Sequence, residues 1–378
     1  MLFLGPRMGG IALSNRLFLG ALAAAWLLAG GAQAQDTPAP NLRVLFRLPV
    51  LLDGRVLHLE AMELRPRGPG PFPLAVIAHG TLDTADKRRQ FTVESFTLQA
   101  VEFARRGFVA LAFLRRGYGT SEGRYAEDNG VCGRMNYASA GAESARDLIE
   151  AIRAMGDRPY VDQRRVLVVG QSAGGFAALA LSQAPPQGVL GIVNFAGGRG
   201  YFPDRNAVCE PEKLIEAMRG YGVRARLPGL WLYAENDKSF PPTLSRQMFQ
   251  AYAAGGGRAE FVLMPAFGEN GHLLFAIGIE QWRAPVDDFL RRLGLPTLPA
   301  SPLAATPPAA RGKTEEAFRK YAASPLPNKA FALSARGAYA WKAGARSVET
   351  AKSEALALCE KHGATCAIAH AVRDFDDQ

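Results

Sequence analysis

The sequence predicts an α/β protein with a mostly parallel sheet, helices on both of its faces, and a small α+β module at the C-terminal end. From residue 73 to residue 293, short aliphatic runs alternate with longer amphipathic segments, which is typical of parallel strands joined by helices. Residues 296–308 contain five prolines and several alanines, so residues 296–313 are predicted to be a linker. A shorter set of elements follows at residues 314–378.

The predicted main domain spans residues 42–295 and opens with a hairpin. Its two strands, at residues 42–52 and 56–64, are joined by Asp53-Gly54, a common hairpin turn. This hairpin supplies an antiparallel edge to the sheet. The later elements are predicted in this order: strand 73–78, helix 93–105, strand 108–114, helix 138–155, strand 166–169, helix 174–182, strand 189–195, strand 230–234, helix 242–253, strand 260–264 and helix 273–293.

Two connections in this domain are longer than the ordinary turns between strands and helices. They span residues 117–137 and 197–223. We interpret both as loops that line or cover a site, because binding residues concentrate on loops held by a rigid scaffold.

The C-terminal module is predicted to contain two helices and two strands. The helices lie at residues 314–321 and 348–361, and the strands at 329–333 and 366–372. Tyr339 and Trp341 are either core residues or part of a binding platform, and the sequence leaves both interpretations open.

The first 34 residues have the character of a signal peptide. Arg7 and Arg16 precede an apolar stretch at residues 17–28, which is short for a membrane span. Ala32-Gln33-Ala34 then gives the small-x-small pattern of a cleavage site, so we expect cleavage after Ala34 and a periplasmic or secreted protein. An uncleaved membrane anchor is the alternative.

The positive charge of the chain does not indicate a nucleic-acid partner. The formal net charge is +9, but the arginines are spread along the sequence and no basic run with interleaved aromatic residues occurs. Nucleic acid is therefore not an expected partner. We expect a small-molecule ester or short peptide as substrate, and weak association with the cell envelope through the C-terminal module.

The four cysteines are expected to form two disulfides, because an exported protein enters an oxidising compartment and an even number of cysteines can all be paired. Cys359 and Cys366 are close together in the C-terminal module, whereas Cys132 and Cys209 lie in the two long loops. We therefore expect the pairs Cys132–Cys209 and Cys359–Cys366. No CxxC spacing or histidine cluster indicates a zinc site, so no metal is expected.

The strongest indication of chemistry is a Gly-x-Ser-x-Gly motif at residues 170–174. It follows the aliphatic strand at 166–169 and precedes the helix at 174–182. A serine at such a sharp strand-to-helix turn has an exposed hydroxyl, and Gly170 and Gly174 prevent clashes across the turn. We interpret Ser172 as a nucleophile. The alternative is a chance motif in a chain with 40 glycines.

A serine nucleophile needs a base and an acid that orients the base. Among the histidines, His272 alone follows the last strand and precedes the last helix, and so lies on the same edge of the sheet as Ser172. Asp237 comes shortly after strand 230–234 and is the expected acid, with Glu235 in reserve. The other histidines are expected to have structural or surface positions: His58, His79, His362 and His370.

The oxyanion of the reaction is expected to be held by two backbone N–H groups. One belongs to Ala173, the residue after the nucleophile, and the other to Thr81 in the loop after strand 73–78. His79, in the same loop, then has a structural role. This chemistry needs no metal or organic cofactor, and none is expected.

These motifs together resemble the α/β-hydrolase superfamily, and within it the dienelactone-hydrolase-like and prolyl-oligopeptidase-like serine hydrolases. The resemblance covers residues 42–295 and rests on segments 76–80, 116–123, 170–175, 233–237 and 271–272, in the order of that fold. It differs from dienelactone hydrolases proper, which have a nucleophilic cysteine, and from the X-prolyl peptidases, which usually have an aspartate where this chain has Leu114. The C-terminal module resembles a small cysteine-paired module of other exported bacterial proteins.

The sequence therefore predicts an exported serine hydrolase that cleaves carboxylic esters through an acyl-enzyme. A peptidase or amidase of the prolyl-oligopeptidase or X-prolyl type is the nearest alternative. For that activity Glu122, Glu127 and Asp128 are candidates to bind a substrate amino terminus. A non-catalytic envelope-binding protein on a hydrolase scaffold is the alternative from another class.

Overall fold

The computed structural model describes residues 41–299, 306–362 and 365–377. The predicted signal peptide at residues 1–34 lies outside these ranges. The strands of the main sheet are β1 (Asn41–Leu52), β2 (Arg55–Arg65), β3 (Phe72–Ala78), β4 (Val109–Phe113), β5 (Val161–Gln171), β6 (Val189–Phe195), β9 (Gly229–Ala234), β10 (Ala259–Met264) and β14 (Phe375–Asp377). In the described residues their order is β10-β9-β6-β5-β3-β4-β2-β1-β14.

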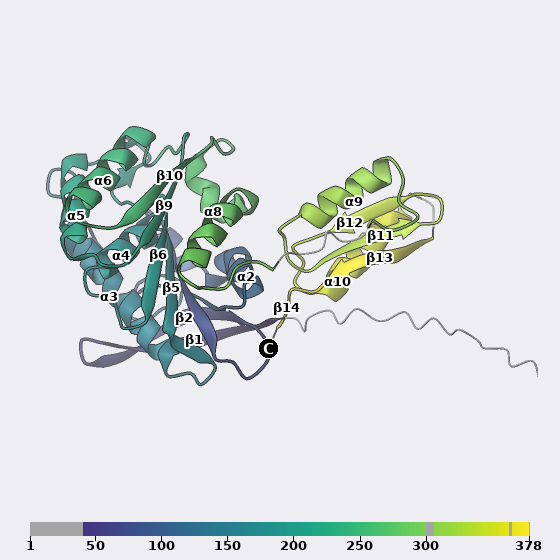
Figure 1. Cartoon of the computed structure of the whole chain (residues 1–378), viewed down its shortest axis with the longest axis horizontal. Coiled ribbons are helices and arrows are strands. Elements are labelled where there is room, and N and C mark those ends of the chain that lie inside the picture. The colour runs from purple at the N-terminus through teal and green to yellow at the C-terminus, as the bar shows by residue number, and fades with distance from the viewer. Residues whose placement is uncertain (1–40, 300–305, 363–364, 378) are drawn as a thin grey trace, which may run out of the picture. The chain divides into compact units, whose positions relative to one another are not determined.

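The sheet is covered by helices on both faces, as predicted. The helices of this part are α1 (Ala85–Gln90), α2 (Thr97–Arg105), α3 (Tyr137–Gly156), α4 (Ala173–Leu181), α5 (Pro211–Arg224), α6 (Pro242–Ala254), α7 (Leu274–Ile277) and α8 (Ile279–Arg292). Helices α3 to α6 pack on one face, and α2 and α8 on the other (Figure 1). Strands β3, β4, β5, β6, β9 and β10 are parallel, and the central ones are apolar and buried on both faces along most of their length.

The direction of these strands decides where the chemistry lies. Because β3, β5, β9 and β10 run the same way, their carboxyl ends meet at one edge of the sheet. The segments that follow them, near residues 79–81, 172, 235–237 and 265–272, therefore converge there. The predicted hairpin is present: β1 and β2 follow β4 in the strand order, far from β10, and the turn residues Asp53 and Gly54 have φ angles of 52° and 72°.

Helix α5 corrects the prediction of a loop at residues 197–223. Two short strands, β7 (Tyr201–Phe202) and β8 (Ala207–Val208), come before it. Gly220 and Gly222 lower the helix propensity of this segment, but packing against α6 overrides propensity. A Cβ on Gly222 would lie only 2.0 Å from the backbone oxygen of Tyr252 in α6, so this close contact requires glycine. The buried residues of α5 have helical spacing: Leu214, Ala217, Met218, Tyr221 and Gly222.

Two predicted helices are divided, and α1 is a second helix, besides α5, that was not predicted. The segment at 93–105 begins as a 3-10 helix, η1 (Val93–Phe96), before α2. The segment at 273–293 begins with a 3-10 turn, η2 (Gly271–Leu273), and is interrupted between α7 and α8 at Gly278, whose N–H bonds to the Leu274 oxygen at 2.8 Å. The short helix α1 was missed because its six residues include none that is buried.

The C-terminal module has its own three-stranded sheet, in which β11 (Lys329–Ser334) lies between β12 (Tyr339–Lys342) and β13 (Cys366–Val372). Tyr339 and Trp341 on β12 are half-buried and pack against an aromatic cluster with Phe331 and Tyr321, which favours a core role. Strands β12 and β14 were not predicted. β14 pairs in parallel with the start of β1, so the end of the chain adds to the main sheet. The module consists of α9 (Lys313–Ala323), β11 (Lys329–Ser334), β12 (Tyr339–Lys342), α10 (Val348–Glu360) and β13 (Cys366–Val372).

The cysteines pair as predicted, Cys132 with Cys209 and Cys359 with Cys366. The first bond joins the segment before α3 to the segment before α5, and its half-cystines are 77 residues apart, against 7 for the second. Tyr137 also donates a hydrogen bond to the Cys209 oxygen, which ties the same two segments together. The disulfide therefore fixes the two long connections to each other.

The two disulfides are expected to differ in their contribution to stability. Loop-closure entropy predicts that removing Cys132–Cys209 lowers the free energy of unfolding by about 4 kcal/mol, and removing Cys359–Cys366 by about 2 kcal/mol. The double variants Cys132→Ser/Cys209→Ser and Cys359→Ser/Cys366→Ser are compared with the wild type by urea unfolding. An equal loss, or a larger loss for the second pair, would contradict this expectation.

Candidate active site

Ser172 lies at a strained turn between β5 and α4. Its backbone angles are φ 55° and ψ −121°, a conformation that non-glycine residues rarely adopt. A Cβ on Gly174 would lie 2.1 Å from the Ala78 oxygen, and one on Gly170 would lie 2.3 Å from the Gly174 oxygen. The two glycines are thus required by the tight packing of the turn, and Ser172 is left half-buried at the edge of the sheet.

Asp237 and His272 are brought together at the same edge. Nδ1 of His272 is 3.1 Å from Oδ2 of Asp237. The Asp237 side chain is fully buried, and its Oδ1 accepts hydrogen bonds from the backbone N–H groups of Ser239 and Phe240 at 2.8 and 2.9 Å. This arrangement fixes the carboxylate and leaves Nε2 of His272 free for another partner. Glu235, the reserve acid, is exposed.

Two asparagines hold the loops that carry Asp237 and His272. The Asn270 side-chain oxygen accepts from the N–H groups of Lys238 and His272, both at 3.1 Å. The Asn236 side chain accepts from Phe267 N–H at 2.8 Å and donates to the Gly268 oxygen at 2.9 Å. Sequence reasoning missed this role, although both asparagines lie next to the predicted acid or base.

Ser172 and His272 lie on loops that contact each other. Among the described residues, no hydrogen bond joins their side chains, and the link between their loops is Gln171 Nε2, which donates to the His272 oxygen at 3.2 Å. Catalytic hydrogen bonds are often long in substrate-free structures and tighten when substrate binds.

The two expected oxyanion donors belong to segments that both approach Ser172. Ala173 is the first residue of α4, so its N–H has no acceptor within the helix. The loop with Thr81 approaches from β3: an added Cβ on Gly80 would lie 3.2 Å from Cβ of Ser172. Thr81 is exposed at this edge. The positive end of α4 points to the same place and favours negative charge there.

His79 is a buried structural residue, as expected from the sequence. Its Nδ1 donates to the Gly80 oxygen at 2.6 Å, and its Nε2 accepts from the Arg115 N–H at 3.0 Å. Burial and the nearby Arg115 guanidinium hold the pKa of His79 well below its usual range. The remaining histidines have other partners or positions: His58 on β2 pairs with Glu122, His362 follows α10, and His370 on β13 is hydrogen-bonded to Tyr321.

Because His79 must stay neutral, the protein is expected to lose stability in mild acid. A depressed histidine pKa contributes stability above the unfolded pKa of about 6.5, and this contribution is lost as the pH falls. Below that pH the unfolded chain binds a proton that the native state does not bind. His79 alone should then lower the free energy of unfolding by about 1.4 kcal/mol for each pH unit.

NMR titration of the imidazole signals tests this expectation directly. The His79 signal should keep its neutral chemical shifts down to pH 5 while the protein stays folded, and urea unfolding should show the loss of stability between pH 7 and pH 5. A His79 signal that titrates near pH 6.5 would contradict the assignment.

A buried polar cluster lies beside the oxyanion loop and was not found from the sequence. Glu127 is 2% exposed and accepts from Arg115 Nε and Nη2 at 2.7 and 3.0 Å. Arg199 is also buried and forms an ion pair with Glu127, with 3.3 Å between its Nη2 and Oε1 of Glu127. Burial alone would raise the pKa of Glu127, but these two cations hold it below its usual range. Because Glu127 is already paired with two arginines, its carboxylate is not available to bind a substrate ammonium group.

The other two acidic candidates have different surroundings. Glu122 is exposed and pairs with His58, and Asp128 accepts from the Gly130 N–H in a local turn. In the described ranges, no three His, Cys, Asp or Glu side chains come together as ligands for a metal ion. Among the described helices, none combines the length and apolar character needed to span a membrane.

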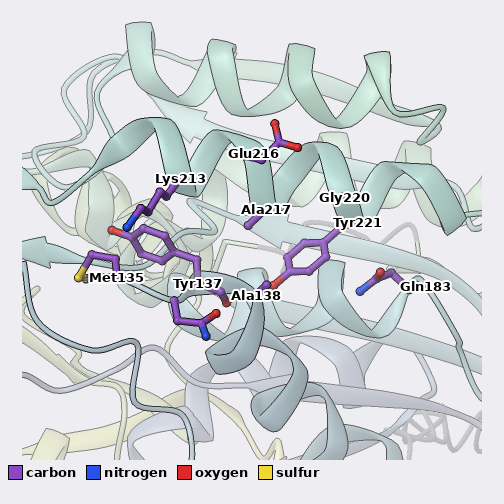
Figure 2. A pocket seen from close by; sticks show the side chains of 10 residues that line it. Met135, Tyr137, Ala138, Gln183, Lys213, Glu216, Ala217, Gly220 and Tyr221 are labelled. Carbon is purple, nitrogen blue, oxygen red and sulfur yellow. Dashed lines mark hydrogen bonds between the residues drawn. The ribbon is translucent and has the colours of Figure 1, made fainter. Parts of the chain in front are cut away.

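A groove of about 340 Å³ lies between the start of α3 and α5. Figure 2 shows the rings of Tyr137 and Tyr221 beneath α5, from which Lys213 and Glu216 project. Lys213 forms an ion pair with Glu210. None of the residues lining this groove is Ser172, Asp237 or His272, so it does not mark the chemistry.

Comparison with known proteins agrees with the fold. The model of the prolyl oligopeptidase family matches residues 94–187, which include the turn with Ser172. An acylaminoacyl peptidase from Pyrococcus horikoshii is 15% identical, with a TM-score of 0.50, over 70% of this chain and 43% of that chain.

Two esterases are also similar structures. An esterase from Pyrococcus furiosus is 14% identical, with a TM-score of 0.46, over 66% of this chain and 90% of that chain. Esterase 2 from Thermogutta terrifontis is 17% identical, with a TM-score of 0.46, over 67% and 95%. At such identities a structural likeness bears on the fold alone, while the family match supports a serine hydrolase of the esterase or peptidase type. The chain therefore has the α/β-hydrolase fold.

Proposed function

We propose that this protein is an exported serine hydrolase that cleaves carboxylic esters through an acyl-enzyme. The observation that carries the proposal is the contact between the buried Asp237 carboxylate and His272, at the edge of the sheet where Ser172 lies at a strained turn. A carboxylate paired with an imidazole, together with a serine hydroxyl at the same edge of the sheet, supplies the parts that activate a serine.

In the proposed reaction, the Ser172 oxygen attacks the acyl carbonyl while Nε2 of His272 takes its proton. Asp237 holds the Nδ1 proton and stabilises the imidazolium that forms. The N–H groups of Ala173 and Thr81 bind the negative oxygen of the tetrahedral intermediate. His272 then gives its proton to the leaving alcohol, and water repeats the sequence to release the acid and restore Ser172.

Cleavage of amide bonds is the second candidate, because the family model that matches residues 94–187 is that of the prolyl oligopeptidases. p-Nitrophenyl esters of increasing acyl length and aminoacyl p-nitroanilides, tested on the same purified protein, separate the two activities. We expect higher kcat/KM for the esters. A preference for the anilides under the same conditions would make the protein a peptidase, and turnover of neither class would favour a non-catalytic binding protein.

The proposed location is the periplasm or the exterior, with a small ester or short peptide as substrate. The two disulfides support an oxidising compartment, where such bonds persist. Weak binding to envelope material through the C-terminal module belongs to the same proposal. N-terminal sequencing of the protein from the periplasmic fraction tests it, and the expected mature terminus is Gln35.

A further inference from the structure

Thr81, whose backbone N–H is the second oxyanion donor proposed above, is connected to the buried carboxylate of Glu127 by a chain of hydroxyl groups. Thr81 Oγ1 is 2.9 Å from the hydroxyl of Tyr118. The Tyr118 hydroxyl donates to Oε1 of Glu127 at 2.5 Å. Both Tyr118 and Glu127 are buried, whereas Thr81 is exposed at the edge of the sheet. This series of hydrogen bonds thus connects the protein interior to the loop that approaches Ser172.

The charge on Glu127 fixes the direction of donation along these hydrogen bonds. A carboxylate only accepts hydrogen bonds, so the Tyr118 proton must point toward Glu127. The Tyr118 oxygen is then an acceptor, and the Thr81 hydroxyl must donate to it. Hydrogen bonds to an ionised group are also shorter and stronger than neutral ones. The Thr81 side chain is therefore fixed in one orientation, which restrains its backbone N–H as well.

Arg115 holds His79, which lies two residues before Thr81 in the same loop, and is itself fixed by Glu127. Its Nη1 donates to the His79 oxygen at 2.7 Å, while its Nε and Nη2 donate to Glu127. The Arg115 N–H also donates to Nε2 of His79. Glu127 is therefore linked to both ends of the segment 79–81, through Arg115 at one end and through Tyr118 at the other.

The geometry points to Glu127 and Tyr118 as positioning residues that hold the Thr81 N–H in place for the oxyanion. This inference rests on the proposed serine-hydrolase function. The alternative is that the cluster stabilises only the fold. The two readings differ in what they predict for turnover, because an oxyanion donor acts in the transition state and hardly at all in the bound substrate.

The test measures turnover of a short p-nitrophenyl ester by variants of the whole chain. Tyr118→Phe removes the linking hydroxyl and keeps the ring, and Thr81→Val removes the other hydroxyl and keeps the backbone N–H. Each single variant should lower kcat about 10-fold, less than the 100-fold or more that follows loss of a whole oxyanion donor, with KM within about 2-fold. Tyr125→Phe is the matched control, because its hydroxyl bonds to the backbone oxygen of Glu127 and not to Thr81.

A double-mutant cycle distinguishes positioning from a general loss of packing. Because both hydroxyls act through one hydrogen bond, Thr81→Val/Tyr118→Phe should be about as slow as either single variant. A boronic acid that mimics the tetrahedral intermediate should bind each of these variants more weakly by the same factor as the loss of kcat. Glu127→Gln should give at least the same loss of kcat.

Three results would overturn the inference: an unchanged kcat in both single variants, losses that multiply in the double variant, or an unchanged affinity for the boronic acid. Thr81 is exposed, so Thr81→Val keeps the test valid even if Tyr118→Phe or Glu127→Gln unfolds. If the wild type neither turns over the esters nor binds the boronic acid, the proposed function fails first. Activity in the wild type with unaffected variants overturns the positioning role alone.

Discussion

Replacing Ser172 with alanine is expected to lower kcat for ester hydrolysis by roughly 10⁵-fold, with the fold unchanged. The hydroxyl is the only group removed. Alanine should keep the same turn, because the Ser172 side chain makes no capping hydrogen bond to α4 that its loss would break. The remaining rate would come from the oxyanion donors and substrate binding. Initial rates with p-nitrophenyl acetate and the circular dichroism spectrum provide the measurement.

Ser139→Ala is a suitable control for this variant. Ser139 is exposed on α3 and its side chain lies outside the proposed site, so its loss should leave kcat within about 2-fold of the wild type. Retention of more than a tenth of the wild-type activity by Ser172→Ala would exclude Ser172 as the nucleophile.

Replacing Asp237 with asparagine is expected to lower kcat by roughly 10⁴-fold. Oδ1 of Asp237 accepts two backbone N–H groups, so the amide oxygen of asparagine must take that position. The amide NH₂ then points at Nδ1 of His272 and forces the imidazole proton onto Nε2. In that tautomer His272 cannot accept the Ser172 proton.

Glu235→Gln is the matched control, since Glu235 is two residues away, exposed, and was the reserve assignment from the sequence. Its activity should equal that of the wild type. The opposite result, a large loss in Glu235→Gln with little loss in Asp237→Asn, would transfer the acid role to Glu235.

The elements that position the site could be predicted because their signals are local. The turn with Ser172 follows the apolar run at residues 166–169 of β5, and Asp237 and His272 follow later strands in the same direction, so chain order alone places them at one edge. The two disulfides followed from the position of their cysteines in separate parts of the chain.

The missed features depend on tertiary contacts. Helix α5 contains Gly222, which lowers its propensity, and the reason for that glycine is a close approach to α6. Strand β14 has only three residues and becomes a strand by pairing with β1. Glu127 lies in an irregular segment without periodicity, and only the fold brings it to Arg115 and Tyr118. The double arginine directly after a buried strand, Arg115-Arg116, was the one local sign of buried carboxylates.

The most direct test of the proposed chemistry is covalent labelling of the wild-type protein with a fluorophosphonate. The phosphorus is attacked by an activated serine and fluoride leaves, so the intact mass should rise by one adduct per chain. Peptide mapping should place that adduct on Ser172, and Asp237→Asn should react far more slowly. An unlabelled wild-type protein, or an adduct on another residue, would contradict the assignment of Ser172 as the nucleophile.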